Sequence, residues 1–228
     1  RLMAIVAEGE RGRVYLAPTP NHEAVSGKAR PEWKPELAMP ENPRWFSPPL
    51  YGLKTYGDLF TPRQLVALTT FSDLVQEARE RLKRDALGAG LNDDDCGLAA
   101  GGMGAQGYAD AVATYLAFGI DRTANYCSTL CTWHSGVKYE TVTSTYGRQA
   151  LPMTWDFAEA NPFSGASGNW LGGVEWIANT MAALPLAGSG VAEPADAAVQ
   201  FTSQDRVLST DPPYYDNIGY ADLSDFFY

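Results

Sequence analysis

An acidic residue, two prolines and an aromatic residue follow one another near the end of the chain, as Asp211, Pro212, Pro213 and Tyr214. A turn of this kind can hold an amine that is conjugated with an aromatic ring and is therefore a poor nucleophile. The Asp211 carboxylate and the Pro212 carbonyl could each accept an amine hydrogen, which draws the nitrogen lone pair towards an alkyl donor. The fixed φ of proline holds that carbonyl in place without adding a competing donor. Tyr214 would offer a flat face to a base that has left its duplex, so the motif predicts alkylation of a nucleobase amine.

The elements around this motif should present it at the tip of a strand. Residues 206–210 read as a short strand that feeds the turn, and ligands in open α/β sheets collect beyond the carboxyl ends of strands. A second short strand is possible at residues 198–202. The alternative is a purely structural turn after a strand, because Asp, Pro and Tyr all suit turns.

Helical patterns fill the middle of the chain. Thr61 and Pro62 are a favourable N-cap and first helical residue, and apolar residues then recur at helical spacing to about Gly88. We expect further helices at residues 108 to about 130, 153–160 and 170–184. Short strands are expected at residues 2–7, 13–16 and 137–145, and an extended connection at residues 18–49.

Composition limits the classes to which the chain can belong. Its 228 residues, of which 45% are hydrophobic, suffice for a sizeable core, and the formal charge of −10 is unusual for a protein that binds DNA by itself. No apolar run approaches the length of a membrane span, and no cleavable signal is visible. The three cysteines cannot all pair with one another. The sequence therefore predicts a cytoplasmic protein without a membrane partner.

A glycine-rich stretch at residues 102–107 matches the GxGxxG pattern of nucleotide-binding loops. The preceding residues 93–100 do not read as a strand, and no acidic residue is placed to bind a ribose. We therefore interpret the stretch as a flexible loop.

Cys127, Cys131 and His134 have a spacing that could suit a metal, but a fourth ligand is not apparent. Buried cysteine behaves as a small apolar residue, so we expect core packing and no metal. Residues 161–163 read Asn-Pro-Phe, a near miss to the motif that a helix ending before the proline explains. Arg148 could contact phosphate or pair with an acid, and Trp155 could contact DNA; the sequence leaves both open.

The Asp-Pro-Pro-Tyr motif resembles the (Asp/Asn/Ser)-Pro-Pro-aromatic motif of S-adenosylmethionine-dependent methyltransferases that act on the amino group of adenine or cytosine. Residues 210–228 are similar to a narrower family, the large bacterial and archaeal adenine-specific DNA methylases with a zinc ribbon and an N-terminal domain of unknown function. Residues 56–64, 108–116 and 148–157 resemble the same family. The similarity thus covers most of residues 50–228.

This resemblance implies an α/β fold, a partial Rossmann-like methyltransferase with a helix-rich insertion, in a chain that is predominantly helical with a few short strands. Residues 1–50 would hold short strands and the extended connection, residues 51–190 the helix-rich region, and residues 191–228 part of the methyltransferase core. The implied reaction transfers methyl from S-adenosylmethionine to N6 of a flipped adenine in DNA. Tyr215 and Asn217 are the implied neighbours of the substrate, and Asp196 could contact the adenine of the cofactor.

The family holds the methionine part of the cofactor on an Asp-Pro-Phe-x-Gly-x-Gly loop, and no such sequence occurs here. The resemblance places that loop and the zinc ribbon upstream of Arg1, and both ends of the chain fall within apolar runs. We therefore expect an internal fragment that binds DNA through the full-length protein and is inactive alone.

Other functions remain open. The same chemistry could methylate cytosine N4 or a protein glutamine amide. A different class, favoured by the missing cofactor loop and the acidic charge, is a non-catalytic, helix-rich recognition or scaffold module of a larger phage-defence protein.

Overall fold

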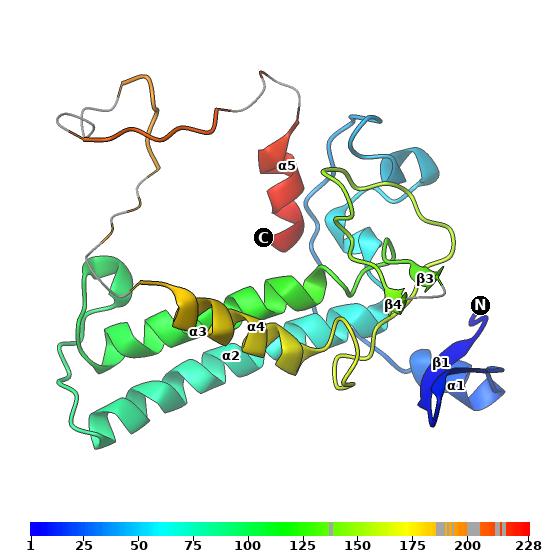
Figure 1. Ribbon diagram of the computed structural model, residues 1–228, viewed down its shortest axis with the longest axis horizontal. Helices are drawn as coiled ribbons and strands as arrows, with labels where there is room; N and C mark the ends of the chain where they lie inside the picture. The colour runs from blue at the N-terminus through cyan, green and yellow to red at the C-terminus, as the bar shows by residue number, and fades with distance from the viewer. Residues whose placement is uncertain are drawn as a thin grey trace.

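The computed structural model describes residues 1–136, 139–185, 190, 192, 194–199, 206–212, 215 and 218–228. Long helices form the centre of the molecule: α2 (Pro62–Gly88), α3 (Ala105–Ala124) and α4 (Trp170–Ala183) lie beside one another, as Figure 1 shows. The strands of these described residues pair as antiparallel hairpins. The prediction of a helix-rich chain with a few short strands is therefore confirmed.

Helix α2 begins and ends where the sequence predicts. The Thr61 hydroxyl accepts the Gln64 N–H at 3.2 Å, and the Gln64 side chain accepts the Thr61 N–H at 2.8 Å. This capping box satisfies two backbone groups that a helix start otherwise leaves unpaired. Leu65, Phe71 and Val75 lie buried along one face of the helix.

Helix α3 packs against α2 through small residues, since Ala105, Ala109 and Ala113 recur every fourth position and are buried. The helix starts three residues before the predicted position and ends near residue 124 rather than 130. Its end is determined by distant backbone: Thr145 N–H donates to the Asn125 carbonyl at 2.6 Å, and Tyr146 N–H to the Asn125 side chain at 3.1 Å.

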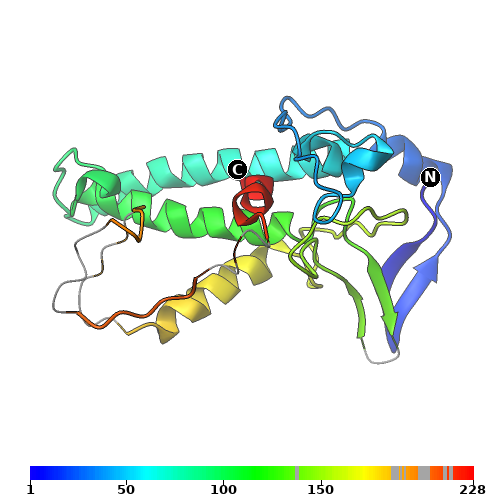
Figure 2. The ribbon, with the colours of Figure 1, turned by 90° about the horizontal axis from the view of Figure 1, so that it is seen from above.

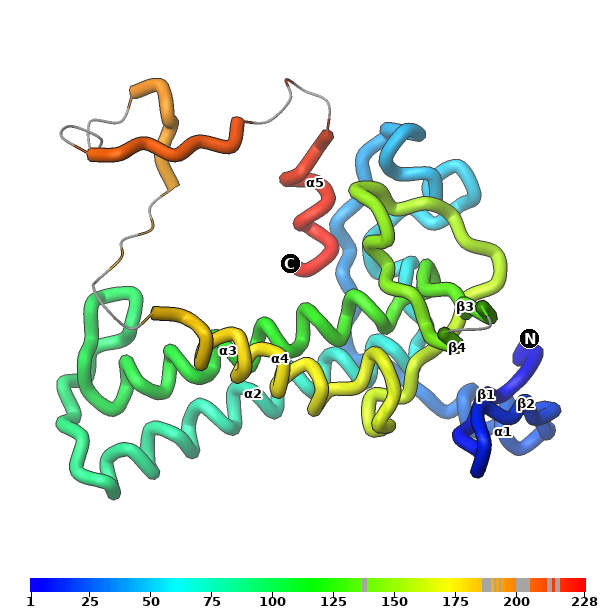
Figure 3. Tube along the Cα trace, viewed as in Figure 1, coloured from blue at the N-terminus to red at the C-terminus, as the bar shows by residue number. Residues whose placement is uncertain are grey.

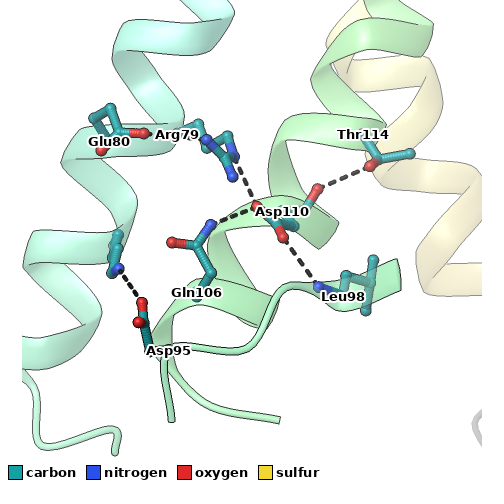
Figure 4. Close-up of polar contacts among 8 residues, drawn as sticks. Arg79, Glu80, Asp95, Leu98, Gln106, Asp110 and Thr114 are labelled. Carbon is teal, nitrogen blue, oxygen red and sulfur yellow. Dashed lines mark hydrogen bonds and ion pairs between the residues drawn. The ribbon is translucent and has the colours of Figure 1, made fainter. Parts of the chain in front are cut away.

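A carboxylate joins α2, α3 and the loop before α3 (Figure 4). Asp110 accepts Arg79 Nε and Gln106 Nε2, each at 2.7 Å, and the Leu98 N–H at 3.0 Å. The Leu98 N–H contributes most to lowering the pKa of Asp110; burial opposes this, and Arg79 lowers the pKa further. These contacts hold the loop against both helices.

Helix α4 confirms the predicted helix at residues 170–184 and crosses α3 closely at two glycines. A Cβ on Gly119 would lie 3.2 Å from the Trp170 ring, and one on Gly173 would lie 3.5 Å from the Gly119 carbonyl. Trp170 also stacks on Phe71 of α2 at 4.8 Å between ring centroids. Within the described part of the chain, no helix is both long enough and apolar enough to cross a membrane.

The apolar core lies at one end of these helices, where short 3-10 turns meet the C-terminal segment. It includes η1 (Pro48–Tyr51), η2 (Tyr56–Leu59), α5 (Tyr220–Ser224) and η4 (Asp225–Phe227). Figure 3 shows the red α5 segment beside the blue segment that precedes η1. Fully or nearly fully buried side chains of this core are Met39, Phe46, Tyr56, Leu59, Leu65, Leu151, Leu223 and Phe226.

Two hairpins lie beside each other away from the long helices (Figure 2). The predicted N-terminal hairpin is present as β1 (Ile5–Gly9) and β2 (Gly12–Leu16), and the predicted β-rich region supplies β4 (Tyr139–Val142), which pairs with β3 (Trp133–Gly136). Tyr15 connects the hairpins: its hydroxyl donates to Glu140 at 2.6 Å and accepts the Trp133 indole N–H at 3.1 Å.

Some local predictions are wrong. The connection at residues 18–49 contains a short helix, α1 (Pro20–Ser26), which the capping residue Thr19 and the following Pro20 begin. Residues 153–160 form no helix, because their backbone bonds to distant groups instead: Met153 N–H donates to Ser47 Oγ at 2.6 Å, and Ala158 N–H to the Cys131 carbonyl at 2.8 Å.

Candidate functional site

Asp211 and Pro212 lie on an extended, exposed stretch between α4 and α5. The orange-red trace of residues 206–212 runs clear of the helices in Figure 1. Val207 is 98% exposed and Leu208 66% exposed, so even the apolar side chains of this stretch have little cover. The described residues of the chain provide the Asp211 carboxylate with no hydrogen-bond or ion-pair partner, which leaves it available to an external donor.

The strand expected at residues 206–210 is not formed. A strand is stable only when its backbone groups pair with a neighbour, and no described strand runs beside this stretch. The possible strand at residues 198–202 is also wrong where the structure describes it, because Ala198 and Val199 lie in a turn. Residues 200–202 lie outside the described residues.

The remaining motif residues divide into two groups. Pro213, Tyr214 and the neighbouring Asn217 lie outside the described residues. Tyr215 is 97% exposed and adopts a left-handed backbone conformation with φ 56°, which is uncommon for a residue with a side chain. The chain therefore turns sharply at the position that follows the motif.

The segment that follows the motif is attached to the body of the molecule. Tyr56 Oη donates to the Asp222 carbonyl at 2.5 Å, and Tyr146 Oη to the Leu223 carbonyl at 2.6 Å. Burial raises the pKa of both tyrosines, so their hydroxyls remain protonated donors. The helix that follows the motif is therefore held to the body of the molecule by two hydrogen bonds.

Asp196, the candidate contact to the cofactor, is exposed and makes a local hydrogen bond. Its Oδ1 accepts the Ala198 N–H at 2.9 Å. This pattern, in which an aspartate bonds the backbone two residues on, is typical of a turn. Asp196 thus has a structural role in the described part of the chain.

The glycine-rich stretch at residues 102–107 forms a loop, and close backbone contacts explain its glycines. A Cβ on Gly102 would collide with the Cys96 carbonyl, and one on Gly107 with the Gly102 carbonyl. Asp94 accepts the N–H groups of Met103 and Gly104 at 3.0 and 2.9 Å, which lowers the pKa of its carboxyl. The chain's own carboxylate therefore occupies the position at the start of α3 that a phosphate would take.

Cys127 and Cys131 are buried, at 3% and 0% exposure, as core packing requires. Burial raises the pKa of the Cys127 thiol to about 12, with a further contribution from Glu159. His134 is exposed, and its Nδ1 lies 3.0 Å from the Tyr139 carbonyl. Throughout the described ranges, no three His, Cys, Asp or Glu side chains are grouped to hold a metal ion.

The other residues singled out by the sequence lie on the surface. Arg148 is exposed and forms no ion pair with any described residue. Trp155 is 74% exposed and packs edge-on against Tyr51 at 5.3 Å between ring centroids. Asn161 accepts the Phe163 N–H at 3.0 Å in a local turn, which accounts for the near miss to the motif.

The structure also contains a cavity that the sequence did not predict. It has a volume of about 410 Å³ and lies between α3, α4 and η4. Asp121 and Trp176 are among its lining residues. The available signal was the helical spacing of Tyr115, Phe118 and Asp121 in the sequence.

No protein-family model matches the chain, and no curated protein sequence and no solved structure shows significant similarity to it.

Proposed function

We propose that the chain is part of an S-adenosylmethionine-dependent DNA amino-methyltransferase and supplies the turn that holds the target amine, N6 of an adenine flipped out of the duplex. The observation that carries this proposal is the exposed Asp211 carboxylate, which has no partner among the described residues, next to Pro212 and shortly before the anchored α5. Anchoring matters because positioning, rather than covalent chemistry, provides most of the rate in such a reaction.

Each residue has a separate part in the proposed reaction. The Asp211 carboxylate and the Pro212 carbonyl accept the two amine hydrogens and turn the nitrogen lone pair out of the ring plane. The new N–C bond would form as the methyl–sulfur bond of the donor breaks, which leaves a neutral thioether. The methylated nitrogen would then carry a positive charge, and the Asp211 carboxylate is the base placed to accept the proton that it releases. Tyr214 stacks on the flipped base, while Tyr215 and Asn217 lie beside it.

The two cofactor contacts that the sequence suggested are occupied by the chain itself. Asp94 fills the anion position of the one GxGxxG loop, and Asp196 is engaged in its own turn. The proposal therefore assigns S-adenosylmethionine binding to another part of the full-length protein, together with the basic surface that a chain of charge −10 lacks.

The proposal also gives residues 206–210 a role. Val207 and Leu208 are apolar and exposed, and such side chains are stabilised when another element covers them. In the proposed Rossmann-like enzyme, this stretch becomes a strand when it pairs with the sheet of the methyltransferase core, which places the motif beyond its carboxyl end.

A second candidate is a non-catalytic recognition or scaffold module of a larger protein. The observation that favours it is the Asp94 carboxylate in the only nucleotide-loop pattern of the sequence. Under this alternative, the Asp-Pro-Pro-Tyr turn has a structural role alone.

Methyl transfer by the full-length protein separates the two candidates. Tritium transfer from labelled cofactor to DNA should fall at least about 100-fold in Asp211→Ala, since that variant loses a charged acceptor for the amine. Asp73→Ala, which changes an exposed carboxylate on α2, is the matched control and should keep full activity. Equal transfer by the wild type and Asp211→Ala would end the proposal.

The product identifies the substrate. Digestion of the methylated DNA to nucleosides and mass spectrometry should show N6-methyladenine. N4-methylcytosine would assign the cytosine variant of the chemistry, and label found in protein would point to a glutamine amide. Absence of transfer, together with absence of cofactor binding by calorimetry, would favour the scaffold module.

A further inference from the structure

The cavity between α3 and α4 has aromatic walls on two sides. On α3, Tyr115, Phe118 and Asp121 are spaced three residues apart and therefore share one face of the helix. On α4, Trp176 belongs to the facing wall, and Phe227 of η4 closes a third side. The volume of about 410 Å³ lies within the range of small-molecule sites.

The glycine crossing explains why the two helices leave this space. They touch at Gly119 and Gly173, where no side chain separates the backbones. Beyond the crossing, bulky residues such as Trp176 and Met181 follow on α4, and the helices diverge. Figure 2 shows the yellow α4 moving away from the green α3 towards the end of α4. The space is therefore built into the packing of two regular helices.

Asp121 is the unsatisfied group of the cavity. Its side chain is half-buried, and its carboxylate has no hydrogen-bond or ion-pair partner among the residues that the structure places. Burial raises the pKa of this carboxyl, with no neighbouring charge that offsets the effect. The Asp121 oxygens still reach solvent, so this burial costs only part of what full desolvation would, and a donor from a ligand would offset it.

The neighbouring Arg122 does not meet this need. Its guanidinium lies over the Trp176 ring at 4.6 Å from the centroid and over Tyr126 at 6.0 Å. The guanidinium is therefore held by ring faces, which attract cations because their π-electrons are negative. Arg122 also lines the cavity, so one guanidinium and one carboxylate belong to its walls. Because the guanidinium is already held against the rings, the Asp121 carboxylate is the group left to accept N–H donors from a ligand.

We propose that this cavity binds an organic cation with an aromatic body, whose N–H groups donate to Asp121 and whose flat face packs against Phe118, Tyr115 and Trp176. The cavity does not include the Asp-Pro-Pro-Tyr motif. The proposed ligand binding can therefore be tested without the proposed methyl transfer. The ligand must have a planar apolar body and at least one N–H donor. The lining residues do not select one cation within this class.

Three small probes of matched shape test the proposal on the wild-type protein. Benzamidine is a flat cation with N–H donors, benzamide is its neutral counterpart, and benzoate is the anion. NMR titration would follow the indole N–H signal of Trp176, assigned by its loss in Trp176→Phe. Benzamidine should bind with a dissociation constant of about 1–10 mM, as expected for a ligand of this size. Benzamide, which lacks the charge, and benzoate, which Asp121 repels, should each bind at least about fivefold more weakly than benzamidine.

A pair of variants locates the charge that selects the cation. Asp121→Asn should weaken benzamidine binding about fivefold or more and leave benzamide binding unchanged. Asp73→Asn, which removes an exposed carboxylate of α2, should change neither. Because both variants remove one negative charge, a difference between them cannot come from the net charge of the protein.

Several results would overturn the inference. One is a Trp176 signal that does not move with benzamidine; another is equal affinity for benzamidine and benzamide. A third is unchanged benzamidine binding by folded Asp121→Asn. The comparison of probes needs no variant, so it decides the question even if Asp121→Asn does not fold.

Discussion

At the scale of single residues, carboxylates in this chain differ sharply in what surrounds them. Asp94 accepts backbone N–H groups, whereas neither the exposed Asp211 nor the half-buried Asp121 has a side-chain partner among the residues that the structure describes. A carboxylate is stabilised by donors and destabilised by burial alone, so these three positions should respond differently to replacement.

Asp121→Asn should stabilise the protein at neutral pH. Burial raises the pKa of Asp121 in the folded chain, so the charged form costs free energy of folding above that pKa, and this cost is absent below the unfolded pKa of about 4. We expect the thermal midpoint of the variant to exceed that of the wild type by about 1–2 °C at pH 7, since an unpaired, partly buried charge is removed. The difference should vanish as the pH falls below about 4. Circular dichroism melts between pH 3 and pH 8 would measure it, with Asp73→Asn as the control.

At the scale of elements, apolar contacts join α2 to α3, and so does the Asp110 carboxylate, which accepts hydrogen bonds from both helices. Asp110 binds Arg79 of α2, Gln106 of α3 and the Leu98 N–H of the preceding loop (Figure 4). The Leu98 N–H has no other acceptor among the described residues, so loss of the Asp110 carboxylate would leave this N–H without a hydrogen bond.

Asp110→Ala should therefore lower the free energy of unfolding by about 1–3 kcal/mol. The pKa of Asp110 is lowered in the folded chain, so its stabilising effect is present above the unfolded pKa of about 4 and is lost as the pH falls through the lower, folded value. Urea unfolding at pH 7 and at about pH 2.5 would show a large difference between the wild type and the variant at pH 7 and a small one in acid. A variant as stable as the wild type at pH 7 would contradict this account of the network.

At the scale of the whole molecule, residues far apart in the sequence complete one core. Phe226 stacks on Phe60 at 5.3 Å between centroids and packs edge-on against Tyr146 at 5.5 Å. The core that supports η2 and α2 therefore depends on the segment that follows the motif.

Phe226→Ala should destabilise the protein by about 3 kcal/mol, since it removes a buried aromatic ring and leaves a cavity. Hydrogen exchange should speed up at residues 220–227 and also around Tyr56, because the Tyr56 hydroxyl bonds to the Asp222 carbonyl. Tyr228→Ala, which changes a 99% exposed side chain at the adjacent position, should leave both measurements unchanged. Faster exchange confined to residues 220–227 would show that this segment does not support the core.

The helices with strong local signals were predictable from sequence. The N-cap at Thr61, whose hydroxyl accepts the Gln64 N–H at 3.2 Å, acts within one turn of the helix. Residues 153–160 were mispredicted because their backbone is bound by Ser47 and Cys131, which no local pattern reveals.

By itself, the sequence determined the positions of α2 and α4, the N-terminal hairpin, and a motif whose residue types suit an amine. Only the tertiary structure decided that Asp211 is exposed, that no described strand pairs with residues 206–210, and that Asp121 lines a cavity. The physical reason is the sequence separation of the interacting residues. Caps, turns and periodic faces depend on residues a few positions apart. Strand pairing and the crossing of α3 and α4 require segments dozens of residues apart to come together.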